Sequence, residues 1–115
     1  MNMSSVHVIV GHVGQDAEIV ELGNGRKKAT ISVADTNTWP GEGGQWNEHT
    51  TWHKVVTFQK GLVEKLEKAG GKGRLVLING RLQCRTYEKE GRTIQVWETI
   101  VENGGELRFL DSAKS

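Results

Sequence analysis

The segment that decides the fold runs from Thr50 to Ile78 and reads TTWHKVVTFQKGLVEKLEKAGGKGRLVLI. Apolar and polar residues alternate over Thr50–Phe58, which is the period of a β-strand. Over Lys60–Ala69 apolar residues recur every three or four positions, which predicts a short helix, and Gly70 and Gly71 end it. An unbroken apolar run then opens another strand, which we expect over Arg74–Tyr87. The segment therefore predicts a strand, a short helix and a strand.

Further strands flank this segment on both sides. The mostly apolar run from Val6 to Leu22 predicts one long first strand, bent at its glycines. The pair Asn24-Gly25 is typical of a type I′ turn, because both central residues of that turn need positive φ. A second strand is expected over Lys28–Thr36, a fifth over Thr93–Val101, and a last short extended piece over Leu107–Leu110.

Three strands, one helix and two more strands contain too little helix for a parallel sheet. They have the order of an all-β, five-stranded antiparallel OB-fold barrel with one short helix between strands 3 and 4. A β-sandwich is the alternative fold. Residues 37–47 lack any period and predict a long loop, against which we expect Trp46 to pack.

The composition limits the classes of function. With 115 residues, the chain fits a single domain, 1–115. Its net charge of +1 does not by itself favour a polyanionic partner. The single Cys84 excludes an internal disulfide and favours a cytoplasmic protein, in which we expect a buried, inert thiol. No apolar run is long enough to cross a membrane.

Aromatic and basic side chains share faces of the predicted strands. The third strand places two rings and one cation on the same face, and the fourth places two arginines and a tyrosine on the same face. The fifth strand leaves a tryptophan among polar residues. These residues are Trp52, Lys54, Phe58, Arg81, Arg85, Tyr87 and Trp97.

Single-stranded nucleic acid requires this mixture, because exposed bases stack on flat rings while the phosphates need positive charge. Each stacked base contributes about 1 to 3 kcal/mol, so several rings can supply affinity that the net charge cannot. Duplex DNA would leave the rings unused. Two alternatives remain. Trp52 and Phe58 could belong to the core, which would bury Lys54 at a cost, and Tyr87 and Trp97 could be packing or oligomer contacts.

Metal binding and catalysis find little support in the sequence. His49 and His53 have helical spacing, but on a strand they would lie roughly 13 Å apart, too far to share an ion. We therefore predict no metal and no cofactor.

A nuclease would need clustered carboxylates; Asp16, Asp35 and Glu98 are the candidates, and nothing in the sequence brings them together. Glu98 itself is expected either to pair with a base or to lie at a rim. We predict that the protein is not an enzyme; a purely structural oligomerisation module is a further alternative.

Several short motifs between Val8 and Leu110 together are typical of one family. They are Val8–Gly11, Val13–Asp16, Asn24-Gly25, Ser32–Ala34 leading to Trp39, Thr51–Val56 with Phe58 and Lys60, and Gly80–Leu82 with Arg85. On these motifs the chain resembles the bacterial-type single-stranded DNA-binding proteins, which are OB-fold homotetramers that coat exposed DNA strands.

The resemblance implies a role for individual residues. Base stacking is implied for Trp39, Trp52, Phe58 and for Tyr87, where the family usually has tryptophan. Phosphate contacts are implied for Lys54, Lys60 and Arg85, and a subunit contact for His53.

The chain departs from the family pattern at both ends. Ser5-Val6 and Val20 stand where the family usually has Asn-Lys and arginine, so positive charge is missing there. Family members typically continue into an acidic tail that recruits other proteins, whereas this sequence ends at Asp111–Ser115. We expect either that the tail has been removed or that this is a phage- or plasmid-type member that protects DNA without recruiting partners.

The sequence thus predicts sequence-independent binding and protection of single-stranded DNA during replication, recombination or repair, by a homo-oligomer in the bacterial cytoplasm. The predicted stacking residues are Trp39, Trp52, Phe58, Tyr87 and Trp97, and the predicted phosphate contacts are Lys54, Lys60, Arg81 and Arg85. The alternative function is that of an OB-fold RNA-binding or primosome-accessory protein.

Overall fold

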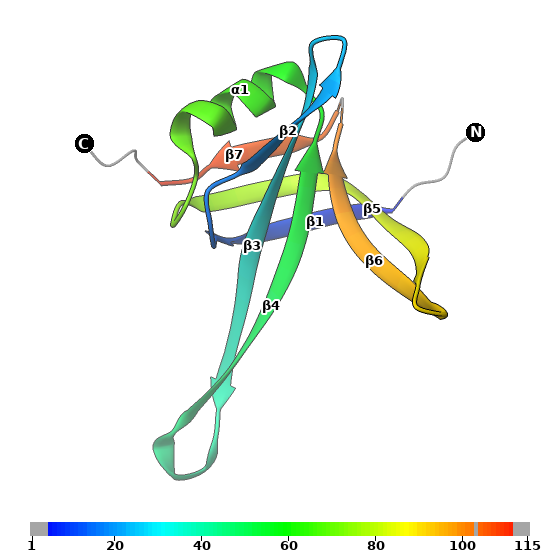
Figure 1. Cartoon of the computed structure of the whole chain (residues 1–115). Helices are drawn as coiled ribbons and strands as arrows, with labels where there is room; N and C mark the ends of the chain where they lie inside the picture. The colour runs from blue at the N-terminus through cyan, green and yellow to red at the C-terminus, as the bar shows by residue number, and fades with distance from the viewer. Residues whose placement is uncertain (1–4, 103, 112–115) are drawn as a thin grey trace.

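The computed structural model describes residues 5–102 and 104–111. Seven strands, one α-helix and one 3-10 turn make up the described chain (Figure 1). They are β1 (Val6–Val13), β2 (Glu18–Gly23), β3 (Arg26–Pro40), η1 (Glu42–Gly44), β4 (Trp46–Thr57), α1 (Lys60–Ala69), β5 (Leu75–Lys89), β6 (Arg92–Val101) and β7 (Glu106–Phe109).

Five of the strands close into a ring in the order β1-β3-β4-β6-β5, and β5 pairs back to β1. The predicted OB fold with its helix between the third and fourth strands of the ring is therefore confirmed, and the β-sandwich is excluded. One pairing in the ring is parallel, that of β4 with β6, whereas the others are antiparallel. A parallel neighbour is possible there because α1 and β5 lie between these two strands in the sequence and return the chain to the same end.

The predicted first strand is interrupted. The chain leaves the strand conformation between Gly14 and Ala17, yet β1 and β2 both pair with β3, at Val13↔Val33 and Glu18↔Thr30. The bend is held in place because the Ala17 N–H donates to the Gly70 carbonyl at the end of α1, over 2.8 Å. The two segments thus act as one curled strand broken at its bend.

The predicted long loop at residues 37–47 is wrong. β3 continues to Pro40, β4 begins at Trp46, and these two residues face each other, so the connection is only 41–45. The result is a long two-stranded arm, residues 35–51, that extends from the barrel (Figure 1). The arm has no strand period in its sequence because neither of its faces is buried. Trp46 does not pack against the connection, since 69% of its surface is exposed.

The turns follow the local sequence signals. Asn24 and Gly25 have φ of 54° and 75°, which confirms the predicted turn between β2 and β3. Glu90 and Gly91 have φ of 52° and 76° and connect β5 to β6 in the same way.

The core fills the barrel and lies beneath α1. The helix covers one end of the ring with Val63 and Leu66 (Figure 1), and Gly70 ends it with φ of 70°. Cys84, expected to be buried, is only half-buried, because β5 has left the core at that point. No helix in the described part of the chain is long and apolar enough to cross a membrane. The core residues are Ile9, Val13, Ala29, Ile31, Val33, Val55, Val63, Leu66, Val76, Ile78, Val101 and Leu107.

We expect Gly11→Ala to destabilise the protein by about 1 to 3 kcal/mol, the usual cost of overpacking. A Cβ at Gly11 would lie 2.1 Å from the carbonyl oxygen of Ala34, where β1 crosses β3. Urea unfolding measures the effect. Gly61→Ala is the matched control: it lies in α1 with open space around it, and alanine there should be neutral or stabilising by up to about 1 kcal/mol. Equal effects of the two substitutions would contradict this account of Gly11.

Candidate nucleic-acid interface

The outer face of β4 carries the first exposed ring, that of Trp52. The indole lies against the backbone of Gly14, since a Cβ added to that glycine would be 2.5 Å from the ring. Its other side is open, and 60% of the residue is exposed. Trp52 is therefore a flat apolar platform fixed from beneath, and the alternative that it belongs to the core is wrong.

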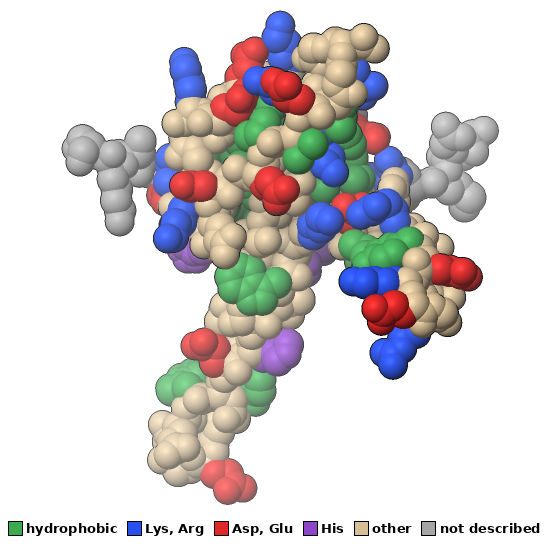
Figure 2. Space-filling view, in the orientation of Figure 1, with side chains coloured by type: hydrophobic (Ala, Val, Ile, Leu, Met, Phe, Trp, Pro, Cys, Tyr) green, Lys and Arg blue, Asp and Glu red, His purple; other side chains and the backbone are tan. Residues whose placement is uncertain are grey.

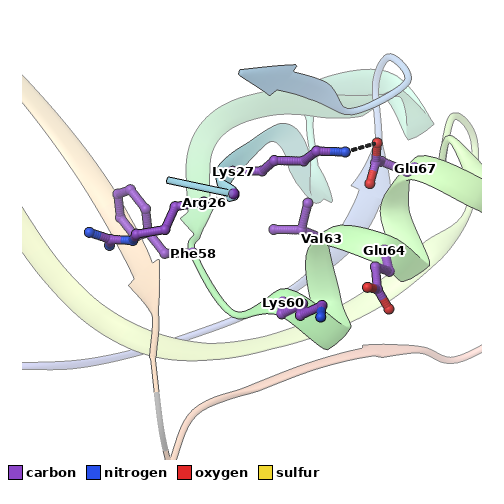
Figure 3. Close-up of a pocket in the computed structure, with 8 residues that line it drawn as sticks. Arg26, Lys27, Phe58, Lys60, Val63, Glu64 and Glu67 are labelled. Atoms are coloured by element: carbon purple, nitrogen blue, oxygen red, sulfur yellow. Dashed lines mark hydrogen bonds and ion pairs between the residues drawn. The ribbon is translucent and has the colours of Figure 1, made fainter. Parts of the chain in front are cut away.

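Phe58 follows the end of β4 and lines two hollows on the surface. The first lies between the β2–β3 turn and α1; Arg26 lies beside the ring, Lys60 lines the hollow from the start of α1, and Lys27 extends away from the ring toward Glu67 (Figure 3). At the far side of this hollow the Lys27 ammonium donates to the Glu67 carboxylate over 3.1 Å. With 41% of its surface exposed, Phe58 is also outside the core. Phe58 is thus an exposed aromatic ring with Arg26 beside it and Lys60 in the same hollow.

Buried Glu98 organises the second hollow beside Phe58. The Arg85 Nε donates to Glu98 Oε1 over 2.8 Å, and the Lys54 Nζ lies 3.3 Å from Glu98 Oε2. Burial by itself raises the pKa of Glu98, but the hydrogen bonds from Arg85 and Lys54 outweigh it and lower the pKa. Glu98 is thus paired with two basic side chains, as the first of the two expectations for this residue held.

The other two predicted phosphate contacts differ in their surroundings. Arg81 donates to the Gln83 and Glu102 side chains, each over 2.8 Å. Lys60 makes no ion pair with another described residue and lines the same hollow as Phe58. Among the described residues, Lys60 is therefore the only one of the four predicted cations that forms no ion pair with a carboxylate.

The register of β5 and β6 separates two of the predicted rings. Tyr87 faces Ile94 and lies on the same side as Arg85, whereas Trp97 faces Cys84 and lies on the opposite side. Tyr87 and Trp97 are both exposed, by 45% and 57%. Only Tyr87 therefore shares the face of the cations.

Trp39 also lies apart from the main face. On the arm it faces Asn47, two residues from His49 and on the side of β3 and β4 opposite to Trp52. The space-filling view shows hydrophobic groups along the arm with carboxylates between them, whereas Lys and Arg side chains gather over the barrel and the β5–β6 hairpin (Figure 2). The structure thus places Trp52, Phe58, Tyr87, Lys54 and Arg85 on the same outer face of their strands, while Trp39 and Trp97 extend the exposed aromatic surface onto the reverse sides of the two hairpins.

Two histidines meet where the arm leaves the barrel. The rings of His7 and His53 lie edge to face, 5.1 Å apart, and His53 Nε2 is 3.6 Å from Asp35 Oδ2. His7 Nδ1 is 2.7 Å from Thr99 Oγ1. His53 is therefore largely enclosed by its own chain, and its subunit role stays a prediction. His7 was missed from the sequence, because no short-range signal pairs residues so far apart.

The three carboxylates considered for a nuclease lie apart. Asp16 accepts the backbone N–H of Lys72, Asp35 faces His53, and Glu98 holds Lys54 and Arg85. In residues 5–102 and 104–111, no three His, Cys, Asp or Glu side chains are grouped so that they could hold a metal ion.

Comparisons with known proteins agree with this geometry. A closed, five-stranded barrel with exposed aromatic and basic side chains on its outer face is typical of the class of OB-fold nucleic-acid-binding domains. The profile of the Single-strand binding protein family matches residues 3–110, and the chain belongs to that family.

Individual relatives support the assignment. The single-stranded DNA-binding protein of Rickettsia felis is 36% identical over 111 residues, which cover 94% of this chain and 73% of the relative. That of Rickettsia conorii is 35% identical over the same shares. A solved structure, described as the Plasmodium falciparum SSB complex with ssDNA, is similar with a TM-score of 0.84 and 32% identity, and covers 96% of this chain and 100% of that one.

We expect the histidine pair to make stability depend on pH. Burial first, and then the neighbouring His53, lower the pKa of His7, while Asp35 partly opposes them. As pH falls below about 6.5, the unfolded chain therefore takes up a proton before the folded chain does. The contribution of His7 to stability is complete above that pH and is lost as pH falls toward the lowered pKa.

Urea unfolding at pH 7.5 and at pH 5.5 tests this expectation. His7→Gln should lose less stability between the two pH values than the wild type does. His12→Gln, at an exposed position of the same strand, is the control and should behave as the wild type. The same pH-dependent loss in His7→Gln and the wild type would contradict the assignment.

Proposed function

We propose that this protein binds and protects single-stranded DNA without regard to sequence, during replication, recombination or repair. One observation carries the proposal: Trp52, Phe58 and Tyr87 are exposed on the outer face on which Lys54 and Arg85 lie. Unpaired bases stack on such rings, and the phosphates between them are met by the cations. The relatives described as single-stranded DNA-binding proteins support DNA as the partner.

The mechanism is one of binding alone, and we assign no chemical step to any residue. Stacking uses the flat face that every base has, so it tolerates any sequence. Trp52 stacks a base on its open side, because Gly14 supports the other side. Phe58 stacks a second base while Lys60 binds an adjoining phosphate, and Tyr87 stacks a third beside Arg85.

The arm adds exposed aromatic side chains to this surface but no positive charge. Residues 35–51 contain Asp35, Glu42 and Glu48 but no lysine or arginine. Phosphates near the tip would meet no fixed positive charge, and Trp46 at the tip therefore contributes less than Trp52. Trp39 lies only one register position from Trp46 but on the opposite face of the arm, and with Trp97 on the β5–β6 hairpin it takes bases from a strand that curls around the two hairpins.

We expect Trp52→Ala to weaken binding of labelled oligo(dT) by about 1 to 3 kcal/mol, the contribution of one stacked base. Trp46→Ala is the matched control, since it removes an equally large exposed ring and should weaken binding less. Fluorescence anisotropy of the labelled strand measures both. Duplex DNA and oligo(rU) of equal length complete the test: equal binding to duplex would overturn the proposal, and preferred binding to oligo(rU) would favour the RNA alternative.

We also propose that the protein acts as a homo-oligomer, four copies in the family that it resembles. β1 exposes the stripe Val6, Val8 and Val10, by 73%, 58% and 50%. β5 pairs with one edge of β1, but among the described residues no strand pairs with the other edge between Val6 and Gly11. An exposed apolar edge strand readily pairs with another chain, and a second copy of β1 satisfies its backbone groups.

Val8→Lys should therefore reduce the molecular mass in solution, measured by light scattering after size exclusion. A charge opposite the same charge in a second copy disfavours strand pairing. The control is Leu22→Lys on β2, which places the same charge at another exposed apolar residue and should keep the wild-type mass. An unchanged mass of Val8→Lys would exclude β1 as the interface.

A further inference from the structure

Glu98 is the one buried acidic residue among those that the structure describes, with 5% of its surface exposed. It lies on β6 between the two hairpins and holds one cation from each neighbouring strand. Lys54 comes from β4 and Arg85 from β5. Arg85 approaches with two nitrogens, Nε at 2.8 Å from Oε1 and one terminal nitrogen at 3.5 Å from Oε2. A single carboxylate therefore connects three strands of the binding surface.

The ring closure creates this contact. Lys54 and Glu98 are direct partners in the parallel pairing of β4 and β6, while Gln83 is the partner of Glu98 on β5 and places Arg85 one pleat further along. All three side chains therefore point from the same face. The two cations remain accessible, since 40% of the Lys54 side chain and 52% of the Arg85 side chain are exposed.

The charges in this cluster do not cancel. One carboxylate and two cations leave a net charge of +1, and each cation keeps N–H groups that Glu98 does not use. A long flexible lysine or arginine loses rotamer freedom when it binds a phosphate. A cation already held by a buried carboxylate has lost that freedom beforehand.

We propose that Glu98 is a positioning residue for DNA binding, which holds Lys54 and Arg85 together as one preorganised phosphate-binding unit. This inference rests on the proposed function. Glu98 does not itself touch the DNA; it faces the cations from beneath, and an incoming phosphate binds their outward N–H groups. The negative charge of Glu98 thereby reduces the long-range attraction of the cluster for phosphate, while its contacts fix the positions of Lys54 and Arg85.

Glu98→Gln tests the proposal, because the amide has nearly the same shape and no charge. The cluster then has two mobile cations in place of one fixed unit. The logarithm of the affinity for oligo(dT), plotted against the logarithm of salt concentration, should become steeper by roughly 0.7 per chain, the contribution of one further phosphate contact. The variant should bind more tightly than the wild type at low salt and more weakly at high salt, so that the two lines cross.

Glu102→Gln is the matched control. Glu102 directly follows β6 and pairs with Arg81, but 54% of its side chain is exposed, so the pair is screened by water. It removes the same charge and should leave the slope nearly unchanged. Equal steepening in both variants would show an effect of net charge alone and overturn the proposal. An unchanged slope in Glu98→Gln, or a line that stays above that of the wild type at every salt concentration, would also overturn it.

A second variant keeps the test valid if Glu98→Gln fails to fold, which thermal unfolding reports. Arg85→Lys keeps the charge of the cluster but replaces the two-nitrogen contact by a single ammonium. It should keep the wild-type slope and bind more weakly at every salt concentration; undiminished affinity would overturn the proposal. Absence of oligo(dT) binding by the wild type itself would overturn the proposed function instead, so the two failures are distinguishable.

Discussion

The close crossing of β1 over β3 at Gly11 is the constraint on which the rest of the structure depends. A side chain there would collide with the Ala34 carbonyl, and only glycine lets β1 pass from β5 to β3. This passage closes the ring. Closure in turn brings β4 beside β6 in parallel, and that pairing places Lys54 next to Glu98. A contact between two backbones in the core thus determines which charges meet on the outer surface.

The division between barrel and hairpins explains how so small a core supports a large binding surface. Buried aliphatic residues lie inside the ring and beneath α1, whereas β3–β4 and β5–β6 continue beyond the core as two-stranded hairpins (Figure 1). Aromatic side chains on these hairpins remain exposed, because no core lies beneath the hairpins. Trp52 is fixed because its indole rests on Gly14, which combines exposure with a defined orientation.

Electrostatics on this surface depend on local pairing more than on the net charge of +1. Lys54 and Arg85 share one buried carboxylate, whereas Arg81 pairs with the exposed Glu102. The ionisable side chains of the arm, residues 35–51, are all acidic residues or histidine. Positive charge is therefore concentrated on the barrel, beside Phe58, and on the β5–β6 hairpin, beside Tyr87 (Figure 2). In the binding that we propose, stacking provides the affinity, and the cations determine where along the surface the phosphates lie.

The sequence by itself determined the helix over Lys60–Ala69, the Asn24-Gly25 turn and the OB order of strands, because these depend on local period and turn chemistry. It also showed that aromatic and basic side chains share strand faces, since that follows from side-chain type and the period of a strand. It did not predict that residues 37–47 form the outer part of the arm, because strands without a buried face have no apolar period. Only the tertiary structure decided that Tyr87 lies with the cations while Trp97 lies on the reverse side, that Glu98 joins Lys54 to Arg85, and that His7 meets His53. The physical reason is that these relations depend on the register between strands, which closure of the ring sets and no single strand contains.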